Sequence, residues 1–403
     1  MSPSGTSGAI PPRGSRKAID IEWFHPAYPV VFIEGQPFDV TYKEKDVDNL
    51  NKRFIEALEK IRLKVMKQGR DLEPLADGDY LACRESLKTV GEDAFGRLPR
   101  GLWQALLGQE ADLQDLGEET SISLDITFPP GMALLWEMVY TGNQADSFAR
   151  GQEEQFWGFR YPIGHLYSPN RLKGLVKLQS GVFASAHAGL QHSEAELQQI
   201  EAKLREIGAA LNLPISLQRL EEAISNEELT GPGKVLELFN REDFAYGMIH
   251  LACHCATPDA EDVSQSFLTI TAHQREVAMI LAKFENFIQR QGSGFRAKYR
   301  PLIFLNACES GTPLQLLQSQ SFPKSLIDFG ANGVIATACR MPDNFAYAFA
   351  TEFYRRLLEK PQTKPYIGEV LLDTRLHFLH EYQNPLGLAY GLYSGTDQRL
   401  LVD

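Results

Sequence analysis

Long uninterrupted hydrophobic runs are missing from this sequence of 403 residues. The apolar run at residues 128–140 contains Glu137 and is too short to cross a hydrocarbon core of about 30 Å. Residues 1–17 are rich in Ser, Gly and Pro and contain no apolar segment of the kind found in signal peptides. We therefore predict no membrane span and no secretion signal, and we interpret residues 1–18 as a flexible N-terminal tail.

Basic residues and cysteines are also few. The sequence has 40 Lys and Arg against 52 Asp and Glu, and the formal net charge of −12 repels phosphate backbones unless basic residues cluster. Because no such cluster is evident, no direct nucleic-acid partner is predicted. The five cysteines are an odd number in a chain without a secretion signal, which favours free thiols in a reducing, cytoplasmic compartment.

Signatures of nucleotide binding are absent as well. There is no P-loop, no G-x-G-x-x-G that opens a helix and no G-x-S-x-G elbow, so no cofactor is predicted. No internal repeat of 20–50 residues is present, which argues against a solenoid. Hydrophobic residues make up 43% and charged residues 23%, which is typical of a soluble globular protein.

What the sequence does contain is an alternation of strand-like and helix-like segments, most regular in the final third. Such an alternation predicts an α/β fold with a mostly parallel sheet flanked by helices. Ser193 and Glu196 fit a capping box at the start of one helix. The predicted strands are 19–23 and 29–32 (a hairpin or meander), 121–128, 181–186, 248–253, 302–307 and 333–338, and the predicted helices are 46–68, 193–214, 277–289, 324–329 and 343–358.

Two of the predicted strands end in reactive side chains, His254 and Cys308. Functional residues of an open α/β sheet gather just beyond the carboxyl ends of its strands, so we expect both residues at equivalent positions. A cysteine becomes a competent nucleophile when a base such as an imidazole stands nearby. The separation of 54 residues is close to the roughly 50 by which the histidine precedes the cysteine in caspase-type peptidases.

Other interpretations of these residues stay open. Cys308, at the end of a buried strand, could be an inert core thiol. His250 lies on the same strand face as His254; we interpret it as a structural hydrogen-bonding histidine and keep it as the reserve candidate for the base. Cys253, His254 and Cys255 could suggest zinc. Adjacent strand residues point to opposite faces, however, and no second Cys-x-x-Cys pair completes a site, so no metal is predicted.

The segments around the two candidate residues, 249–254 and 305–311, resemble the CHAT family of caspase-like cysteine peptidases, clan CD enzymes related to separases. Trp136-Glu137, itself interpreted as core packing with a buried hydrogen-bonding carboxylate, is similar to a Pro-Trp-Glu element of that family. The resemblance covers roughly residues 19–403 and extends to further segments: 330–335, 349–358, 373–375 and 390–393.

This resemblance implies a caspase-like fold in two halves. Residues 19–180 would form an N-terminal pseudo-caspase half, and residues 181–403 a catalytic half that carries the Cys-His dyad. The implied activity is that of a cysteine endopeptidase that cleaves a specific protein partner through an acyl-enzyme, in bacterial regulated proteolysis or defence. The lack of repeats means that any sensor or activator would be a separate protein.

The resemblance also implies roles for individual residues. Cys308 would be the nucleophile and His254 the base and acid, with backbone N–H groups of Cys255 and Cys308 forming the oxyanion hole. Two departures favour an alternative, a catalytically silent caspase-like binding or scaffold module: Cys255 stands where the family usually has Gly, and Arg340 where an acid is expected. The candidate substrate-binding residues are Asp343, Arg340, Glu309 and Asp259.

Overall fold

The structure is a computed structural model that describes the chain except for short segments. The described residues are 16–25, 28–33, 36–39, 43–69, 71–98, 100–102, 104, 106, 121–128, 134–142, 152–167, 174–178, 180–256, 263–292, 294–308 and 321–402.

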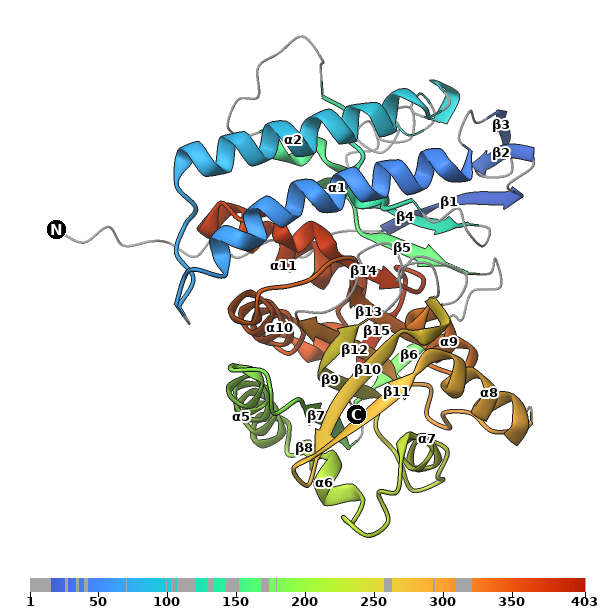
Figure 1. Ribbon diagram of the computed structural model, residues 1–403, viewed down its shortest axis with the longest axis vertical. Coiled ribbons are helices and arrows are strands. Elements are labelled where there is room, and N and C mark those ends of the chain that lie inside the picture. The colour runs from blue at the N-terminus through green and yellow to red at the C-terminus, as the bar shows by residue number, and fades with distance from the viewer. Residues whose placement is uncertain are drawn as a thin grey trace, which may run out of the picture.

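One large β-sheet runs through both halves of the described chain (Figure 1). Its path is β11-β10-β9-β12-β13-β14-β5-β4-β1-β2-β3, and β7 pairs with β9 and with β8. A separate pair joins β6 and β15. The strands are β1 Arg16–His25, β2 Tyr28–Ile33, β3 Gln36–Asp39, β4 Ser121–Thr127, β5 Ile163–Leu166, β6 Leu175–Lys177, β7 Gly181–Ala186, β8 Ser216–Arg219, β9 Met248–Ala256, β10 Phe267–Ala272, β11 Arg275–Ile280, β12 Leu302–Cys308, β13 Gly333–Thr337, β14 Tyr390–Tyr393 and β15 Arg399–Leu401.

Strand direction places the predicted dyad at one end of this sheet. Strands β8, β7, β9, β12 and β13 run parallel to one another, so their carboxyl ends meet at the same end of the sheet. Strand β14 is antiparallel to β13 and parallel to β5, which continues in parallel with β4 and β1. Strands β14, β5, β4 and β1 therefore point their carboxyl ends the opposite way.

Helices cover both faces of the sheet, as expected for buried parallel strands. In Figure 1, α5 and α10 stand on one side of it and α7, α8 and α9 on the other. Strand β13 is buried along its whole length. The α-helices whose bounds the structure describes are α1 Glu44–Val65, α2 Asp77–Gly96, α4 Trp157–Arg160, α5 Ser193–Leu211, α6 Leu220–Ala223, α7 Pro232–Phe239, α8 Leu281–Gln291, α9 Phe322–Asp328, α10 Asp343–Leu357 and α11 Ile367–Tyr382. The predicted α/β fold, with a mostly parallel central sheet flanked by helices, is confirmed.

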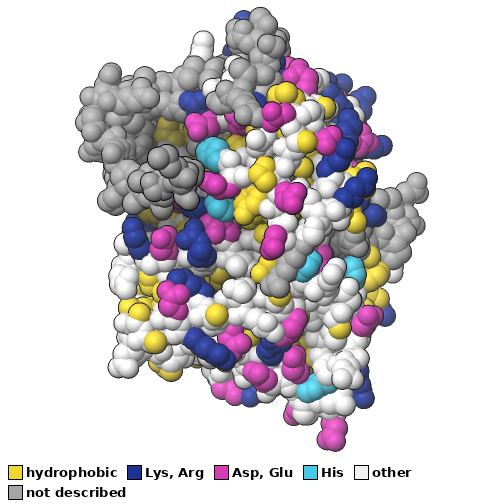
Figure 2. All heavy atoms as spheres, turned by 90° about the vertical axis from the view of Figure 1, so that its left-hand side faces the viewer, with side chains coloured by type: hydrophobic (Ala, Val, Ile, Leu, Met, Phe, Trp, Pro, Cys, Tyr) yellow, Lys and Arg dark blue, Asp and Glu magenta, His cyan; other side chains and the backbone are white. Residues whose placement is uncertain are grey.

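The 3-10 helices near the site and the core are η1 Trp136–Met138, η2 Glu153–Gln155 and η6 Pro385–Ala389. No helix of the described residues is long and apolar enough to cross a membrane. On the face that carries α5 and α10, acidic and basic side chains are interspersed rather than sorted by sign (Figure 2).

The predicted helix at 277–289 is partly wrong. Residues Arg275–Ile280 form strand β11, which pairs antiparallel with β10, and α8 begins only at Leu281. The connection is a two-residue turn of His273 and Gln274, both with positive φ, a conformation that hairpin turns usually give to Asn or Gly. Since neither residue is a typical turn former, the sequence carried no clear hairpin signal.

The capping box predicted for Ser193 and Glu196 is also wrong, although the helix itself is present as α5. Its N-cap is His192. The Ser193 hydroxyl donates instead to the backbone oxygens of His187 and Leu190. Glu196 turns into the core, where it is 1% exposed. Both side chains therefore make other contacts and do not cap the helix.

Candidate active site

The carboxyl ends of β9 and β12 bring the two candidate catalytic residues to one place. The two strands pair in parallel from Leu302 and Met248 onward, and the last register partners are Cys308 and His254. The structure describes Cys308 by its backbone, as the final residue of β12. His254 is partly exposed near the end of a strand whose earlier residues are buried. The backbone thus places His254 and Cys308 at equivalent ends of adjacent strands, as predicted.

A second imidazole lies against His254. His187 directly follows β7, and the centroids of the two rings are 4.7 Å apart with an edge-to-face angle of 66°. Strand β7 pairs with the first part of β9, up to Ala252, and beyond that point β10 takes over the pairing with β9. The chain therefore leaves the sheet beside His254. The rule that singles out residues at strand ends applies to His187 as well and could have found it from the sequence.

A buried polar network lies beneath the strand ends. His250 Nε2 is 2.6 Å from Glu196 Oε1, and the Asn306 amide donates to the same carboxylate oxygen at 2.7 Å. Asn306 also donates to the backbone oxygen of Ala346 at 3.0 Å and accepts from the Tyr390 hydroxyl at 2.8 Å. These contacts tie β9 and β12 to α5, α10 and β14 just below the candidate dyad.

This network explains the role of His250. The side chain is fully buried and paired with Glu196, so it has no exposed edge to offer a substrate. Burial raises the pKa of Glu196, and the like charge of Asp343 adds to the rise, while His250 and Asn306 oppose it. The structure thus supports the interpretation of His250 as a structural histidine, buried and paired with Glu196.

The four cysteines whose side chains are described are free thiols and buried: Cys83, Cys253, Cys255 and Cys339. Burial raises the pKa of Cys83, Cys255 and Cys339 to about 12 and that of Cys253 well above its usual value. A thiol with such a high pKa is a poor nucleophile near neutral pH. Among the described residues, no group of three or more His, Cys, Asp or Glu is arranged to hold a metal ion.

The predicted substrate-binding residues are only partly described. Asp343 is the first residue of α10, is partly buried and accepts a hydrogen bond from the backbone N–H of His192 at 2.9 Å. Arg340 is exposed on the connection between β13 and α10. Both residues therefore follow β13 at the same end of the sheet as His254. Glu309 and Asp259 lie outside the described residues.

The oxyanion-hole prediction concerns two backbone N–H groups at these strand ends. Cys308 is the last residue of β12, and Cys255 is the last but one of β9. Cys255 pairs with Leu268 of β10, so the backbone is regular strand immediately after His254. Its side chain is part of the hydrophobic core. Since adjacent strand residues face opposite ways, the Cys255 side chain does not crowd the face of His254.

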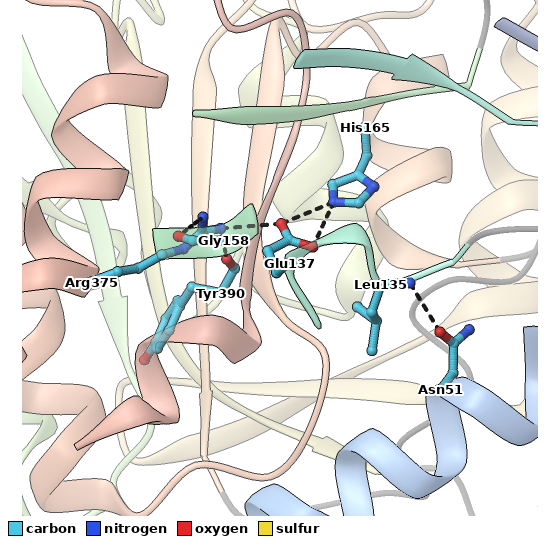
Figure 3. A network of polar contacts seen from close by, with 7 residues as sticks. All are labelled: Asn51, Leu135, Glu137, Gly158, His165, Arg375 and Tyr390. Carbon is cyan, nitrogen blue, oxygen red and sulfur yellow. Dashed lines mark hydrogen bonds and ion pairs between the residues drawn. The ribbon is translucent and has the colours of Figure 1, made fainter. Parts of the chain in front are cut away.

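The segments 135–137 and 373–375 meet in a second buried network, shown in Figure 3. Glu137 lies between His165, whose Nε2 is 3.0 Å and 3.1 Å from the two carboxylate oxygens, and Arg375, whose Nη2 is 3.1 Å from Oε1. Arg375 also donates to the backbone oxygens of Gly158 and Tyr390. Glu137 is thus a buried hydrogen-bonding carboxylate.

Similar solved structures include three peptidases of low identity. The arginine-specific cysteine proteinase gingipain R of Porphyromonas gingivalis is 10% identical, with a TM-score of 0.43 over 96% of this chain and 78% of the other. Separase from Saccharomyces cerevisiae, in complex with securin, is 11% identical, with a TM-score of 0.39 over 91% of this chain. The Drosophila initiator caspase Dronc is 8% identical, with a TM-score of 0.33 over 57% of this chain and 87% of its own.

The chain spans 23% of the separase chain that it matches. No match is found among curated proteins. At these identities and TM-scores the solved structures do not bear on the family assignment, which comes from the sequence itself. The CHAT domain model matches residues 56–381, which is most of this chain. The chain therefore belongs to the CHAT domain family.

Proposed function

We propose that this protein is a cysteine endopeptidase of the CHAT type, in which Cys308 is the nucleophile and His254 the base and acid. The observation that carries the proposal is the pairing of Cys308 with His254 as register partners at the carboxyl ends of adjacent parallel strands. Register partners lie about 5 Å apart at Cα and on the same face of a sheet. That spacing suits proton transfer between a thiol and an imidazole.

The proposed reaction is acyl transfer in two stages. His254 takes the thiol proton as the sulfur of Cys308 attacks the scissile carbonyl carbon, and the oxyanion is held by the backbone N–H groups of Cys255 and Cys308. His254 then gives the proton to the departing amine as the C–N bond breaks, which leaves a thioester. Water, deprotonated by His254, attacks the thioester carbonyl and releases the carboxylic acid and the free thiol.

The surroundings of His254 support this role. The strand is anchored four residues earlier by the buried pair of His250 and Glu196, while His254 itself is partly exposed. The other described thiols have raised pKa values because they are buried, so they do not compete as nucleophiles. Rigid support beneath a partly open imidazole is what a catalytic base requires.

The finer biological assignment is part of the same proposal. The substrate is one specific protein partner, recognised near Asp343, Arg340, Glu309 and Asp259, and a separate sensor or activator protein controls the cleavage. The setting is bacterial regulated proteolysis or defence in the cytoplasm.

Cleavage by matched variants tests the proposal. A peptide library and candidate protein partners are incubated with the unchanged protein, with Cys308→Ala and with His254→Ala. Both variants should lower the cleavage rate by at least about 10³-fold. Cys83→Ala and His380→Ala are the matched controls, because Cys83 is buried in α2 and His380 is exposed on α11, and both should retain activity. Cleavage that persists in both dyad variants contradicts the proposal.

One observation favours the second candidate, a catalytically silent binding module. Strand β9 continues as regular paired strand through Ala256, where family members usually have a glycine directly after the histidine. A silent module would bind its partner equally well with Cys308 or Cys308→Ala and would leave every peptide intact. A partner that is bound tightly and cut only by the unchanged protein rules this candidate out.

A further inference from the structure

We propose that His187 is a positioning residue for the candidate dyad, whose buried imidazole holds the His254 ring in place. This inference rests on the proposed function, since the role of His254 as base and acid is part of that proposal. What carries it is the geometry around the two rings at the ends of β7 and β9.

His187 is fixed to the same strand that carries His254. Its backbone N–H donates to the Ala252 oxygen at 2.8 Å, two residues before His254 in β9. Its backbone oxygen accepts from the Ser193 hydroxyl of α5 at 3.0 Å. The ring is 3% exposed and meets His254 edge to face at 4.7 Å. His187 therefore cannot shift without disturbing β9, and its ring forms a fixed wall beside His254.

The hydrogen bonds of the ring define its neutral tautomer. The backbone N–H of Gly189 donates to His187 Nδ1 at 2.9 Å, so this nitrogen carries a lone pair. The proton of the neutral ring is then on Nε2, which lies 3.5 Å from Glu276 Oε1 of β11. The Nδ1 nitrogen is thus oriented by a group other than His254.

Among the described residues, the titratable groups that act on His187 are His254 on β9 and Glu276 on β11. Burial is the main cause that lowers the pKa of His187, and the charge of His254 lowers it further, while Glu276 opposes them. His187 therefore stays neutral near pH 7. Two charged imidazolium rings would repel each other. Since His187 is neutral, this repulsion does not oppose the uptake of the thiol proton by His254.

Gly189 offers a way to move His187 without removing it. A Cβ at this position would lie 2.7 Å from His187 Cε1 and 2.9 Å from Nδ1. Gly189→Ala therefore pushes the imidazole out of place while all histidines remain. Glu276→Gln is the mild counterpart, because the Glu276 side chain is 70% exposed and lies 3.5 Å from Nε2, which makes a weak contact.

Steady-state kinetics, normalised to the titrated concentration of active thiol, test the positioning role of His187. His187→Ala and Gly189→Ala should each lower kcat by about tenfold or more with little change in KM, since a displaced base loses rate rather than binding. Glu276→Gln should change kcat by less than about threefold. His187→Phe keeps a ring beside His254 and should recover part of the loss. Its kcat/KM should also depend less steeply on pH on the acid side than that of the unchanged protein, because Phe cannot take up a proton.

A measurement without turnover separates this inference from the proposed function. The His254 imidazole signals are followed by NMR in histidine-labelled protein, with His254→Gln to assign them. His187→Ala and His187→Phe should shift these signals. Unchanged His254 signals, or an unchanged pH profile at an unchanged kcat, overturn the inference. If no peptide is cut by any form, the proposed function fails, while the NMR result still decides whether His187 positions His254.

Discussion

Glu137 and Arg375 form a fully buried ion pair, with 3.1 Å between Glu137 Oε1 and Arg375 Nη2, although 238 residues separate them in the sequence. Glu137 belongs to η1, and Arg375 to α11 near the end of the chain. The contacts of Arg375 with Gly158 and Tyr390 extend the link to α4 and β14. Through Arg375, helix α11 thus binds η1 and α4 of the N-terminal half.

Breaking this pair should strongly destabilise the protein. Arg375→Met leaves the Glu137 carboxylate buried with only His165 beside it, and such a loss costs about 3–5 kcal/mol of the free energy of unfolding. Urea denaturation followed by circular dichroism measures it. Lys234→Gln is the control, because Lys234 and Glu237 pair on the surface with both side chains 44% exposed, and it should cost less than about 0.5 kcal/mol. A loss below about 1 kcal/mol for Arg375→Met contradicts the account.

The same pair predicts an acid-dependent term in stability. Burial alone would raise the pKa of Glu137, but His165 and Arg375 outweigh it and lower the pKa below its usual 4.5. Because the pKa of Glu137 is depressed in the folded state, the stabilisation that its carboxylate contributes is complete above pH 4.5. It is lost as the pH falls through the lower pKa of the folded protein. Unfolding free energies from pH 3 to 7 should therefore show a steeper acid loss in the unchanged protein than in Glu137→Gln. Equal slopes argue against the assignment.

The second buried glutamate should respond with the opposite sign. The pKa of Glu196 is raised, so the folded protein holds its proton more tightly than the unfolded chain does. Its contribution is largest at low pH and declines as pH rises from 4.5 toward the folded value. Glu196→Gln keeps the shape, and its amide oxygen at the place of Oε1 can still accept from Asn306. We expect it to be neutral or stabilising at pH 7 in thermal unfolding, whereas Glu137→Gln is destabilising. A large loss for Glu196→Gln would show that its charge is required.

Asn344 joins the two halves at a helix end. Its amide donates to the backbone oxygens of Val65 and Gly69 at 3.1 Å and 3.0 Å, which satisfies carbonyl groups at the C-terminus of α1 from the start of α10. Asn344→Ala should cost about 1–3 kcal/mol and speed hydrogen exchange in the last turn of α1. Asn344→Asp, which cannot donate, should behave alike. Unchanged exchange in α1 in both variants contradicts this link.

The parts of the fold that follow from local pattern were predictable. The buried strands at 302–307 and 333–338 and the long helix at 343–358 lie where their apolar pattern places them, as β12, β13 and α10. The hairpin of β10 and β11 was not predictable, because His273 and Gln274 are unusual turn residues. The direction of β14, which lets one sheet pass into the N-terminal half, depends on tertiary pairing that no local pattern reveals.

The candidate site was predictable to the same extent. Strand ends identified His254 and Cys308 and placed them at equivalent positions, because this follows from chain direction in a parallel sheet. That the two residues are register partners is shown only by the structure. The neighbourhood of His254 did not follow, since His187 approaches it only because β10 replaces β7 beside β9. Glu196 was misassigned to a local cap because its partners, His250 and Asn306, are distant in the sequence. Whether Cys308 and His254 act as a dyad stays a prediction.

Site-resolved labelling with a thiol-reactive acyl probe tests that central claim most directly. The native protein is treated near pH 7.5, and mass spectrometry follows the labelling rate of each of the five cysteines. Burial raises the pKa of Cys83 to about 12, so its thiolate is scarce, and Cys308 should be labelled at least about tenfold faster. His254→Ala should remove most of that advantage. Labelling of Cys308 that is no faster than that of Cys83, or that is unaffected by His254→Ala, would contradict the proposed dyad.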